Sequence, residues 1–241
     1  MKIALIGYGK MGKEIEKIAL ARNHTISMKI DIDNISDINL LNKSNTDVVI
    51  EFTSPQTALE NVLKCFNQGL PVVCGSTGWN NQISIAEKKC IENNLSFIWS
   101  SNYSIGVNIF FALNKHLAAI MNSYPGYEPS ISEIHHIHKK DAPSGTAITL
   151  AEGLIQNYSK KKLWKLAPEK GQDILSIEAQ RIDEVPGTHS IKYESDADYL
   201  EITHCAKGRQ GLATGAVLAA EFIKDKKGVF TMGDLLDISV S

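Results

Sequence analysis

The sequence predicts an α/β fold in which a doubly wound parallel sheet carries an inserted α+β domain with a mixed sheet. Over roughly the first 100 residues, short β-branched apolar runs alternate with longer segments of helical periodicity, a pattern typical of βαβ units. After Ser100 this pattern gives way to one long apolar helix and several segments with strand periodicity. We therefore expect a parallel-sheet domain of residues 1–104 plus 209–241, and an inserted domain of residues 105–208.

Strands of the first domain are expected where apolar runs are short, and helices where apolar residues recur every three or four positions. The helix after the first strand, for example, places the apolar residues between Met11 and Ala19 on one stripe. The expected strands are 3–6, 25–30, 48–52, 71–74 and 96–99, and the expected helices are 11–21, 57–66 and 83–92.

The inserted domain is expected to begin with a long apolar helix, which is followed by segments that alternate like antiparallel strands. The lysines at 160–162 and the loop around Pro168 are expected to be solvated connections. The last two helices are expected to pack back on the first domain. The expected helices are 107–121, 146–158, 211–223 and 229–236, and the expected strands are 130–138, 174–183, 189–194 and 199–205.

Composition excludes several classes of protein. The chain has 241 residues and is 43% hydrophobic, which is enough for a substantial core. A formal net charge of −2 gives no basic excess for nucleic acid or an anionic membrane surface. Because no apolar run of about 18 residues occurs, we expect a cytoplasmic protein without a membrane partner. The four cysteines form no CxxC pair, which favours reduced thiols over disulfides or structural zinc.

A glycine motif, Gly7-Tyr8-Gly9-Lys10-Met11-Gly12, follows the first expected strand and opens the first expected helix. In such a motif Gly7 permits a tight turn, Gly9 lets the backbone approach a pyrophosphate, and Gly12 allows close packing of helix on strand. The helix N-terminus then faces the anion. This context predicts a Rossmann-type dinucleotide site, and the alternative is a glycine-rich turn without a ligand.

An acidic residue, Asp31, stands at the end of the second expected strand, where an acid accepts hydrogen bonds from an adenosine ribose. Asp33 is a rival for that role. A carboxylate there repels a 2′-phosphate, and Ile32 supplies no guanidinium to attract one, so NADH is favoured over NADPH. The nearby cations Lys10 and Lys29 soften that preference.

Two further loops lie at the carboxyl ends of expected strands, which is the edge where open α/β sheets bind ligands. They are Gly75-Ser76-Thr77-Gly78 and Ser100-Ser101-Asn102-Tyr103. Small residues and backbone amides at this edge suit the ribose and nicotinamide half of a dinucleotide. Taken alone, each loop is equally well an ordinary turn.

The densest polar cluster lies between Glu133 and Thr146 and holds three of the seven histidines. In a regular strand His136 and His138 would share one face and His135 the other. A pocket that uses both His135 and His136 therefore requires the strand to end or bend there. The same alternation scatters potential zinc ligands, and no cysteine is near, so a metal site is disfavoured.

Cations and a helix start complete this cluster. Lys139 and Lys140 lower the pKa of adjacent histidines and so favour neutral rings that exchange protons near pH 7. The segment Ser144-Gly145-Thr146 begins a helix, whose amides form a second anion site. We interpret the cluster as a site for an anionic, carboxylate-bearing substrate with a histidine or lysine proton donor. A solvated loop is the alternative.

Six motifs in order resemble the 4-hydroxy-tetrahydrodipicolinate reductase (dihydrodipicolinate reductase) family of diaminopimelate and lysine biosynthesis. They are GYGKMG, EFTSP, CGSTGW, SSNYSIGVN, EIHHIHKKDAPSGTA and RQGLATGA, and the fifth is the most diagnostic. The resemblance implies NAD(P)H-dependent reduction of (2S,4S)-4-hydroxy-2,3,4,5-tetrahydrodipicolinate to tetrahydrodipicolinate with release of water. It also implies a homotetramer built through the sheets of the inserted domain.

The resemblance further implies roles for individual residues. His135 looks like the proton donor or acceptor and Lys139 like the proton donor, while His136, Gly145 and Thr146 look like contacts to the substrate carboxylates. The residues that would hold the cofactor are Gly7, Tyr8, Gly9, Lys10, Met11, Gly12, Asp31, Gly75, Ser76, Thr77, Ser100, Ser101, Asn102 and Tyr103.

The chain departs from the family pattern near the cofactor. Its first loop is compact and carries Lys10 where many members have a longer loop with an arginine, and Ile32 replaces the arginine often found after the acid. Both departures leave the choice between NADH and NADPH open. One alternative function is another Rossmann oxidoreductase, such as a semialdehyde or amino-acid dehydrogenase, for which Cys74 is the candidate nucleophile. The other is a non-catalytic dinucleotide sensor, in which His135 and Lys139 are dispensable.

Overall fold

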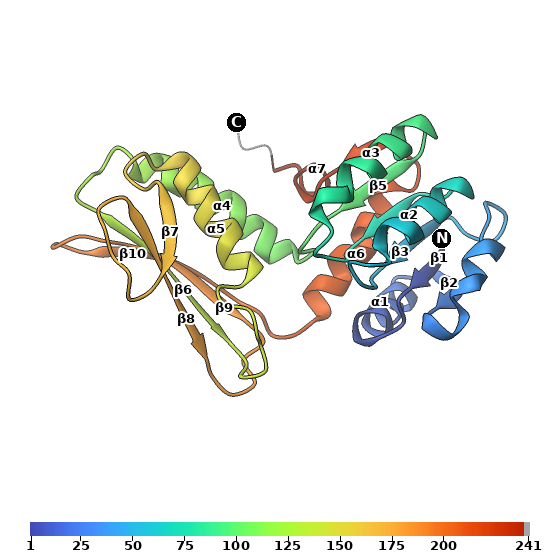
Figure 1. Ribbon diagram of the computed structural model, residues 1–241, viewed down its shortest axis with the longest axis horizontal. Coiled ribbons are helices and arrows are strands. Elements are labelled where there is room, and N and C mark those ends of the chain that lie inside the picture. The colour runs from blue at the N-terminus through green and yellow to red at the C-terminus, as the bar shows by residue number, and fades with distance from the viewer. Residues whose placement is uncertain (239–241) are drawn as a thin grey trace. The chain divides into compact units, whose positions relative to one another are not determined.

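The computed structural model describes residues 1–238, which form two compact units, each with its own sheet (Figure 1). The first unit comprises Met1–Ile105 together with residues 209–238, and the second comprises Gly106–Gly208. None of the helices in the described part of the chain has the length and hydrophobicity needed to cross a membrane.

The first unit contains a six-stranded sheet in the order β11-β5-β4-β3-β1-β2. Every neighbouring pair is parallel. The order runs outward from β1 in both directions, so a topological switch point lies between β1 and β3. This architecture confirms the predicted Rossmann-type fold. The strands are β1 (Lys2–Ile6), β2 (Thr25–Ile30), β3 (Val48–Glu51), β4 (Val72–Cys74), β5 (Ser96–Trp99) and β11 (Gly228–Phe230).

Helices cover both faces of this sheet because its strands are apolar on both sides. Val49 and Val72 pack with α2 and α3, whereas Ile50 and Val73 pack with α1 and α6. The return of α6 to the first unit confirms the prediction for the C-terminal region. The helices are α1 (Lys10–Ala21), α2 (Ala58–Asn67), α3 (Ile83–Glu92), α6 (Gln210–Ile223) and α7 (Met232–Leu236), with 3-10 helices η1 (Ile32–Leu40) and η2 (Asn80–Gln82).

The expected helix 229–236 is wrong in its first half. Gly228–Phe230 is instead strand β11, which extends the parallel sheet beside β5. The helix begins only at Met232, because the side chain of Thr231 accepts from the backbone of Asp234 and the Asp234 carboxylate accepts from the backbone of Thr231. This capping box was visible in the sequence as Thr-x-x-Asp and marks the helix start.

The second unit contains a five-stranded sheet in the order β10-β9-β6-β8-β7. The predicted mixed sheet is confirmed: β10, β9 and β6 are antiparallel neighbours, and β8, which was expected only to alternate like an antiparallel strand, runs parallel to both β6 and β7. Residue alternation reports which face is buried and not the strand direction, so the sequence pattern could not separate the two cases. The elements are β6 (Glu128–His135), β7 (Leu163–Leu166), β8 (Ile174–Arg181), β9 (Thr188–Glu194), β10 (Tyr199–Cys205), α4 (Ile105–Met121) and α5 (Gly145–Asn157).

One face of this sheet is covered by α4 and α5, and its character changes along the strands. Ile131 and Ile191 pair across β6 and β9 and lie in the apolar core under the two helices. Two residues further along, Glu133 pairs with His189, and His189 pairs with His204 of β10. Since residues two apart share a face, a polar row continues the apolar core at one end of the sheet.

The lysines at 160–162 are not all solvated, which corrects the sequence-based expectation. Lys161 is fully buried, forms an ion pair with Glu128, and donates to the carbonyl oxygen of Gln172 at 3.1 Å. Lys162 and the residues after it lead into strand β7, which the sequence analysis missed. A buried ammonium requires such partners, and these come from segments distant in sequence.

Candidate active site

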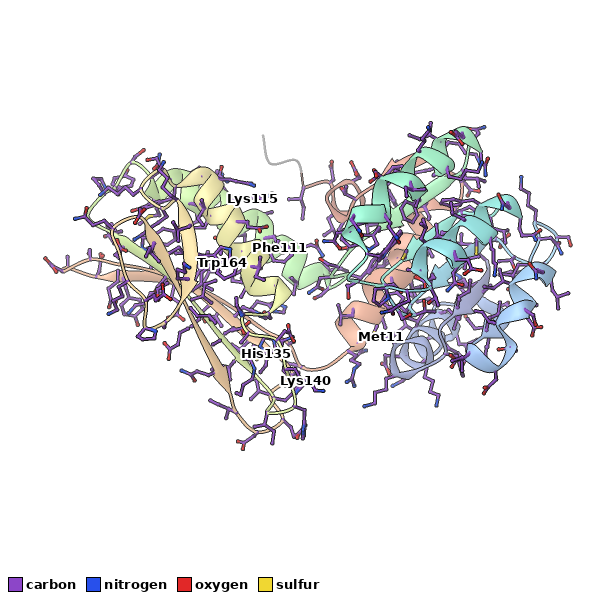
Figure 2. All side chains as sticks on the ribbon, viewed as in Figure 1. Met11, Phe111, Lys115, His135, Lys140 and Trp164 are labelled. Carbon is purple, nitrogen blue, oxygen red and sulfur yellow. The ribbon has the colours of Figure 1, made fainter. Side chains whose placement is uncertain are left out.

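The polar cluster of the second unit begins where β6 ends at His135, three residues before the expected end (Figure 2). The backbone amide of Lys139 donates to the carbonyl oxygen of His136 at 3.1 Å, so the chain turns instead of continuing as a strand. This is the bend that the sequence analysis required for a pocket using both His135 and His136.

The three histidines of the motif take different surroundings. The buried ring of His135 lies 4.9 Å from that of His189, centre to centre. His136 lies 6.0 Å from His138, and the exposed His138 pairs with Glu184 at 3.0 Å. His135 thus lies beside His189, whereas His136 lies beside His138.

A fully buried carboxylate, that of Glu133, lies beneath the cluster. It accepts from the backbone amide of Ser144, at 3.1 Å to each oxygen, and pairs with Nη2 of Arg181 at 3.2 Å. Ring nitrogens of His135 and His189 each lie 3.6 Å from its Oε2 atom. The carboxylate therefore contacts four residues from four different segments.

The charges of this group shift two pKa values. Burial raises the pKa of Glu133, but the neighbouring ring of His189 and the hydrogen bonds from Ser144 outweigh burial and lower that pKa to about 2. Burial is the main reason that the pKa of His135 falls to about 4, with a further contribution from the adjacent His189. The predicted direction is confirmed, but its main cause is burial and not the lysines. A ring with this pKa is neutral near pH 7.

The ammonium group of Lys139 is held by a carboxylate of its own loop. Its Nζ atom donates to the two carboxylate oxygens of Asp141 at 2.9 and 2.8 Å. The pKa of Asp141 is lowered overall. Burial alone would raise it, but the ion pair with Lys139 and the other nearby donors and charges together outweigh burial. The side chain of Lys139 is 22% exposed, which leaves part of it accessible to a ligand.

The helix that follows the loop begins in the way that the motif predicts. The Oγ atom of Ser144 caps α5 by accepting from the backbone amide of Ala147 at 3.2 Å. A side chain added at Gly145 would meet no other part of the protein within 4 Å, so the backbone there is open to approach. No acidic residue lies in the first turn, which includes Thr146. The helix dipole therefore favours an anion at this end.

Sequence analysis missed three residues of this site. Arg181 and His189 come from β8 and β9, and Gly187 precedes β9. A Cβ atom at Gly187 would lie 3.1 Å from Nε2 of His135, and the φ angle of Gly187 is +150°. Sequence signals were weak, because an arginine at a strand end and a lone histidine occur in many solvated strands.

The side chains of Glu133, His135 and His189 offer metal-ligand atoms that all lie within 4.8 Å of one another. A metal ion fits this arrangement poorly. Both carboxylate oxygens already accept from Ser144, one also faces the guanidinium of Arg181, and Nε2 of His189 lies 3.0 Å from the Ser144 hydroxyl.

In the first unit, the loops at the carboxyl ends of the parallel strands are joined by backbone hydrogen bonds. The amide of Gly7 donates to the carbonyl oxygen of Ile30 at 2.8 Å, which brings the glycine motif next to Asp31. The amide of Gly75 donates to the carbonyl oxygen of Glu51 at 2.9 Å. The structure thus places the loops selected from the sequence along one edge of the sheet.

The glycine motif has the backbone that the sequence analysis expected. Gly7 has φ of +91°, and a Cβ atom at Gly12 would lie 2.3 Å from the carbonyl oxygen of Gly7. Tyr8 donates to Glu16, which also pairs with Lys29 at 2.6 Å. Of the other positions in the motif, Gly9 and Lys10 are exposed and Met11 is partly buried.

Asp31 has a local structural role as well as its expected one. Its carboxylate accepts from the amide of Ile32 at 3.0 Å, and its own amide donates to Asn34 at 2.8 Å, so it caps η1. Asp31 and Asp33 are both exposed, and Ile32 has 84% of its surface exposed. The carboxylate of Asp31 therefore stands beside the glycine motif without a neighbouring arginine in sequence.

The loop after β4 is held by side chains that point inward. Indole nitrogens of Trp79 and Trp99 each donate to the carbonyl oxygen of Ser76 at 2.8 Å. The hydroxyl of Ser76 accepts from the amide of Thr53 at 2.7 Å, while Thr77 is exposed. The buried part of this loop is thus fixed by uncharged hydrogen bonds.

The loop after β5 requires one correction. Ser100 and Asn102 are partly buried and Ser101 is exposed, as suits a ligand loop. Tyr103, however, is only 1% exposed and its hydroxyl donates to the carbonyl oxygen of Cys74 at 2.9 Å. Its ring packs in the core and anchors the loop, so the side chain is not placed to contact a cofactor.

The thiol of Cys74 is not suited to nucleophilic catalysis. Cys74 is fully buried, and its Sγ atom donates to the carboxylate of Glu51 at 2.9 Å. Burial and the charge of Glu51 raise the pKa of this thiol well above its ordinary value. Because the thiolate is the reactive form, this environment argues against a dehydrogenase with Cys74 as nucleophile.

Known proteins resemble the chain over nearly its whole length. Family models described as dihydrodipicolinate reductase, N-terminus and C-terminus, match residues 1–103 and 106–236. The 4-hydroxy-tetrahydrodipicolinate reductase of Christiangramia forsetii is 49% identical over 236 residues, 98% of either chain. That of Methanocaldococcus jannaschii is 32% identical over 98% of this chain and 81% of its own.

A solved structure shares the fold. The dipicolinate-bound dihydrodipicolinate reductase of Paenisporosarcina sp. TG-14 superposes with a TM-score of 0.74 at 21% sequence identity, over 96% of this chain and 97% of its own.

Proposed function

The chain belongs to the dihydrodipicolinate reductase family, and from this premise we propose how its residues divide the work of the reaction. The enzyme is an NAD(P)H-dependent oxidoreductase that converts 4-hydroxy-tetrahydrodipicolinate to tetrahydrodipicolinate and water. The observation that carries this function is the full-length identity of 49% to a curated reductase. When bound, the reduced nicotinamide supplies a hydride, so the protein must bind a dicarboxylate and supply a proton.

We assign proton donation to Lys139. His135 is neutral near pH 7, because its pKa is lowered to about 4, and so it carries no proton to give as an acid. The ammonium of Lys139 lies partly exposed on the adjacent loop, where Asp141 fixes its direction. His135 would then act as a neutral group that accepts or relays a proton.

We assign binding of the substrate carboxylates to the start of α5 and its neighbour in the loop. The amides of Gly145 and Thr146 lie at the N-terminus of this helix, where the dipole favours an anion. The ring of His136 is partly buried in the preceding turn, with its Nδ1 atom buried. Dipicolinate, the planar dicarboxylate bound in the Paenisporosarcina reductase, is a suitable probe of this site.

We assign cofactor binding to the loops at the carboxyl edge of the parallel sheet, with a preference for NADH. The preference is supported by the exposed Asp31 carboxylate, which would repel a 2′-phosphate, and by the isoleucine that follows it. Lys29 offers little compensation, because its ammonium is paired with Glu16 at 2.6 Å. Only Lys10, in the glycine loop, is an exposed cation of the motif.

The assay is the initial rate of NADH and, separately, of NADPH oxidation, with the substrate generated in the cuvette by its synthase. We expect rapid substrate-dependent oxidation and a higher kcat/KM with NADH. Asp31→Ser should narrow the ratio between the two cofactors. Cofactor oxidation that requires no substrate would overturn the assignment. So would the absence of oxidation with either NADH or NADPH when the cofactor still binds.

The two alternative functions make different predictions in the same assay. A dehydrogenase that uses Cys74 would lose turnover in Cys74→Ala, whereas the reductase should retain it. A non-catalytic dinucleotide sensor would bind NADH but show no turnover, and replacement of His135 or Lys139 would change nothing.

We further propose a homotetramer assembled through the open face of the second unit's sheet. That face carries small polar residues, including Ser130, Ser132 and Ser190, which are partly buried even in the single chain. Light scattering on the eluted protein should give four times the chain mass, and a monomer mass would contradict this assembly. The cytoplasm remains our prediction for its compartment.

A further inference from the structure

The buried carboxylate of Glu133 is a feature of the second unit to which the proposed function assigns no role. A carboxylate with no exposed surface costs free energy unless it is paired and hydrogen-bonded. Its partners are not an arbitrary set, because each of them belongs to or contacts a segment that carries a proposed reacting or binding group.

We propose that Glu133 is a positioning residue, whose carboxylate holds the loop from Lys139 to Ser144 and the start of α5 in the geometry that binds and protonates the substrate. The proposal rests on the roles assigned above to His135, Lys139 and Gly145. It adds a residue that touches neither substrate nor cofactor but sets the place of those that do.

The first connection runs to the substrate-carboxylate end. The amide of Ser144 donates to both oxygens of Glu133, at 3.1 Å each, so the backbone just before Gly145 is fixed in direction. The Ser144 hydroxyl is fixed as well, because it lies 3.0 Å from Nε2 of His189 and accepts from Ala147. The first turn of α5 is thus oriented by a buried charge.

The second connection runs to the proton donor. Nη2 of Arg181 donates both to Oε1 of Glu133, at 3.2 Å, and to the carbonyl oxygen of Asp141, at 2.5 Å. Nε of the same guanidinium donates to the carbonyl oxygen of Lys139 at 3.3 Å. Arg181 therefore holds the backbone of the residue that carries the ammonium and of the residue that pairs with it. Without the carboxylate, this guanidinium would lose its anionic partner.

The third connection runs to His135. Its Nδ1 atom is buried and has no hydrogen-bond partner, and the charged group beside it is the Glu133 carboxylate at 3.6 Å. A carboxylate on this side favours the neutral tautomer with the proton on Nδ1, which leaves Nε2 as an acceptor. The other charged or titratable groups around this ring are His189, Lys139 and Arg181.

The test compares Glu133→Gln with wild type and with the shorter acid Glu133→Asp. For Glu133→Gln we expect the KM for the substrate and the Kd for dipicolinate to rise about 10- to 100-fold, because charge-assisted hydrogen bonds to Ser144 and Arg181 are lost. The Kd for NADH should stay within about twofold. Glu133→Asp should recover part of the loss, since it restores the charge.

A matched control is Glu128→Gln, which removes the carboxylate partner of the buried Lys161 in the same unit. Thermal unfolding should show a lower Tm for both Glu133→Gln and Glu128→Gln. In Glu128→Gln, however, the KM for the substrate and the affinity for dipicolinate should be unchanged. If Glu133→Gln does not fold, Arg181→Met removes the second connection instead. The side chain of Arg181 is 20% exposed whereas that of Glu133 is fully buried, and its replacement should also raise the KM for the substrate.

Wild-type KM and dipicolinate affinity in Glu133→Gln would overturn the inference, as would an equal rise in KM in Glu128→Gln. Failure of the proposed function would look different, because wild type itself would then not oxidise NADH with the substrate.

Discussion

The loop after β4 in the first unit and the loop from Lys139 to Ser144 in the second are held in place by different kinds of interaction. Around Ser76 the fixing bonds come from two indoles and a backbone amide, all of them uncharged. The loop from Lys139 to Ser144 is instead fixed by Glu133, Arg181 and an ion pair with Asp141. The comparison indicates that charge changes and pH should perturb the loop from Lys139 to Ser144 far more than the loop after β4.

The largest effect should come from Lys139→Ala. Loss of the proposed proton donor should lower kcat by about 10²- to 10⁴-fold, the usual contribution of general acid catalysis. Because the dinucleotide edge lies in the other unit, the Kd for NADH, measured by fluorescence titration, should stay near wild type. Wild-type turnover in this variant would remove Lys139 from the mechanism, and Lys140→Ala, the neighbouring exposed lysine, is the control.

A steric change beside His135 should have the next largest effect. In Gly187→Ala the new Cβ atom would lie 3.1 Å from Nε2 of His135, at a backbone φ of +150° that alanine rarely adopts. We expect kcat/KM to fall about 10- to 100-fold through displacement of the ring. Gly126→Ala, where a Cβ atom meets nothing within 4 Å, is the matched control and should behave as wild type. Equal kinetics in both variants would contradict the placement of His135.

Acid should destabilise the protein in a window set by His135. Its pKa in the folded protein, about 4, lies below the ordinary value of 6.5, so the neutral ring is the form that the fold favours. This contribution is present above pH 6.5 and is lost as pH falls toward 4. Denaturant midpoints measured across this range should fall less steeply in His135→Gln than in wild type.

Glu133 acts in a lower window. Because its pKa is about 2 in the folded protein and 4.5 ordinarily, the ionised carboxylate stabilises the protein above pH 4.5. That contribution is lost as the pH falls from 4.5 to 2.

The prediction for His135 would be contradicted by parallel curves of the denaturant midpoint for wild type and His135→Gln between pH 6.5 and 4, because the ring would then not be buried in its neutral form.

The smallest effect should come from the dinucleotide edge. Trp99→Phe removes one indole hydrogen bond to Ser76 and should cost about 0.5–1.5 kcal/mol of unfolding free energy. We expect the KM for NADH to rise a few-fold, with the substrate KM unchanged. A rise in the substrate KM without a rise in the KM for NADH would contradict the assignment of NADH to the first unit and of the substrate to the second.

Much of the fold could be predicted because its signals are local. The strands Thr25–Ile30 and Ser96–Trp99 were expected at their observed bounds, since apolar runs and helical periodicity mark each element where it stands. Strand β11 was missed because three residues give no periodicity, and Lys161 was misassigned because charge alone predicts exposure.

The site divides in the same way. Residues within one motif, from His135 to Thr146, could be selected from the sequence, as could the glycine loop. Arg181 could not, because it reaches Glu133 from 48 positions away and only through the pairing of β6 with β8. The side chain of Tyr103 was misjudged for a different reason. The local sequence does not distinguish a tyrosine whose side chain contacts a ligand from one that anchors the same loop in the core.

The most direct test of this division is a crossed titration, in which NADH and dipicolinate are each titrated into wild type, Glu133→Gln and Trp99→Phe. We predict that Glu133→Gln loses affinity for dipicolinate and keeps it for NADH, and that Trp99→Phe does the reverse. Parallel losses of both ligands in either variant would contradict the account, because they would show that the two sites are not held separately.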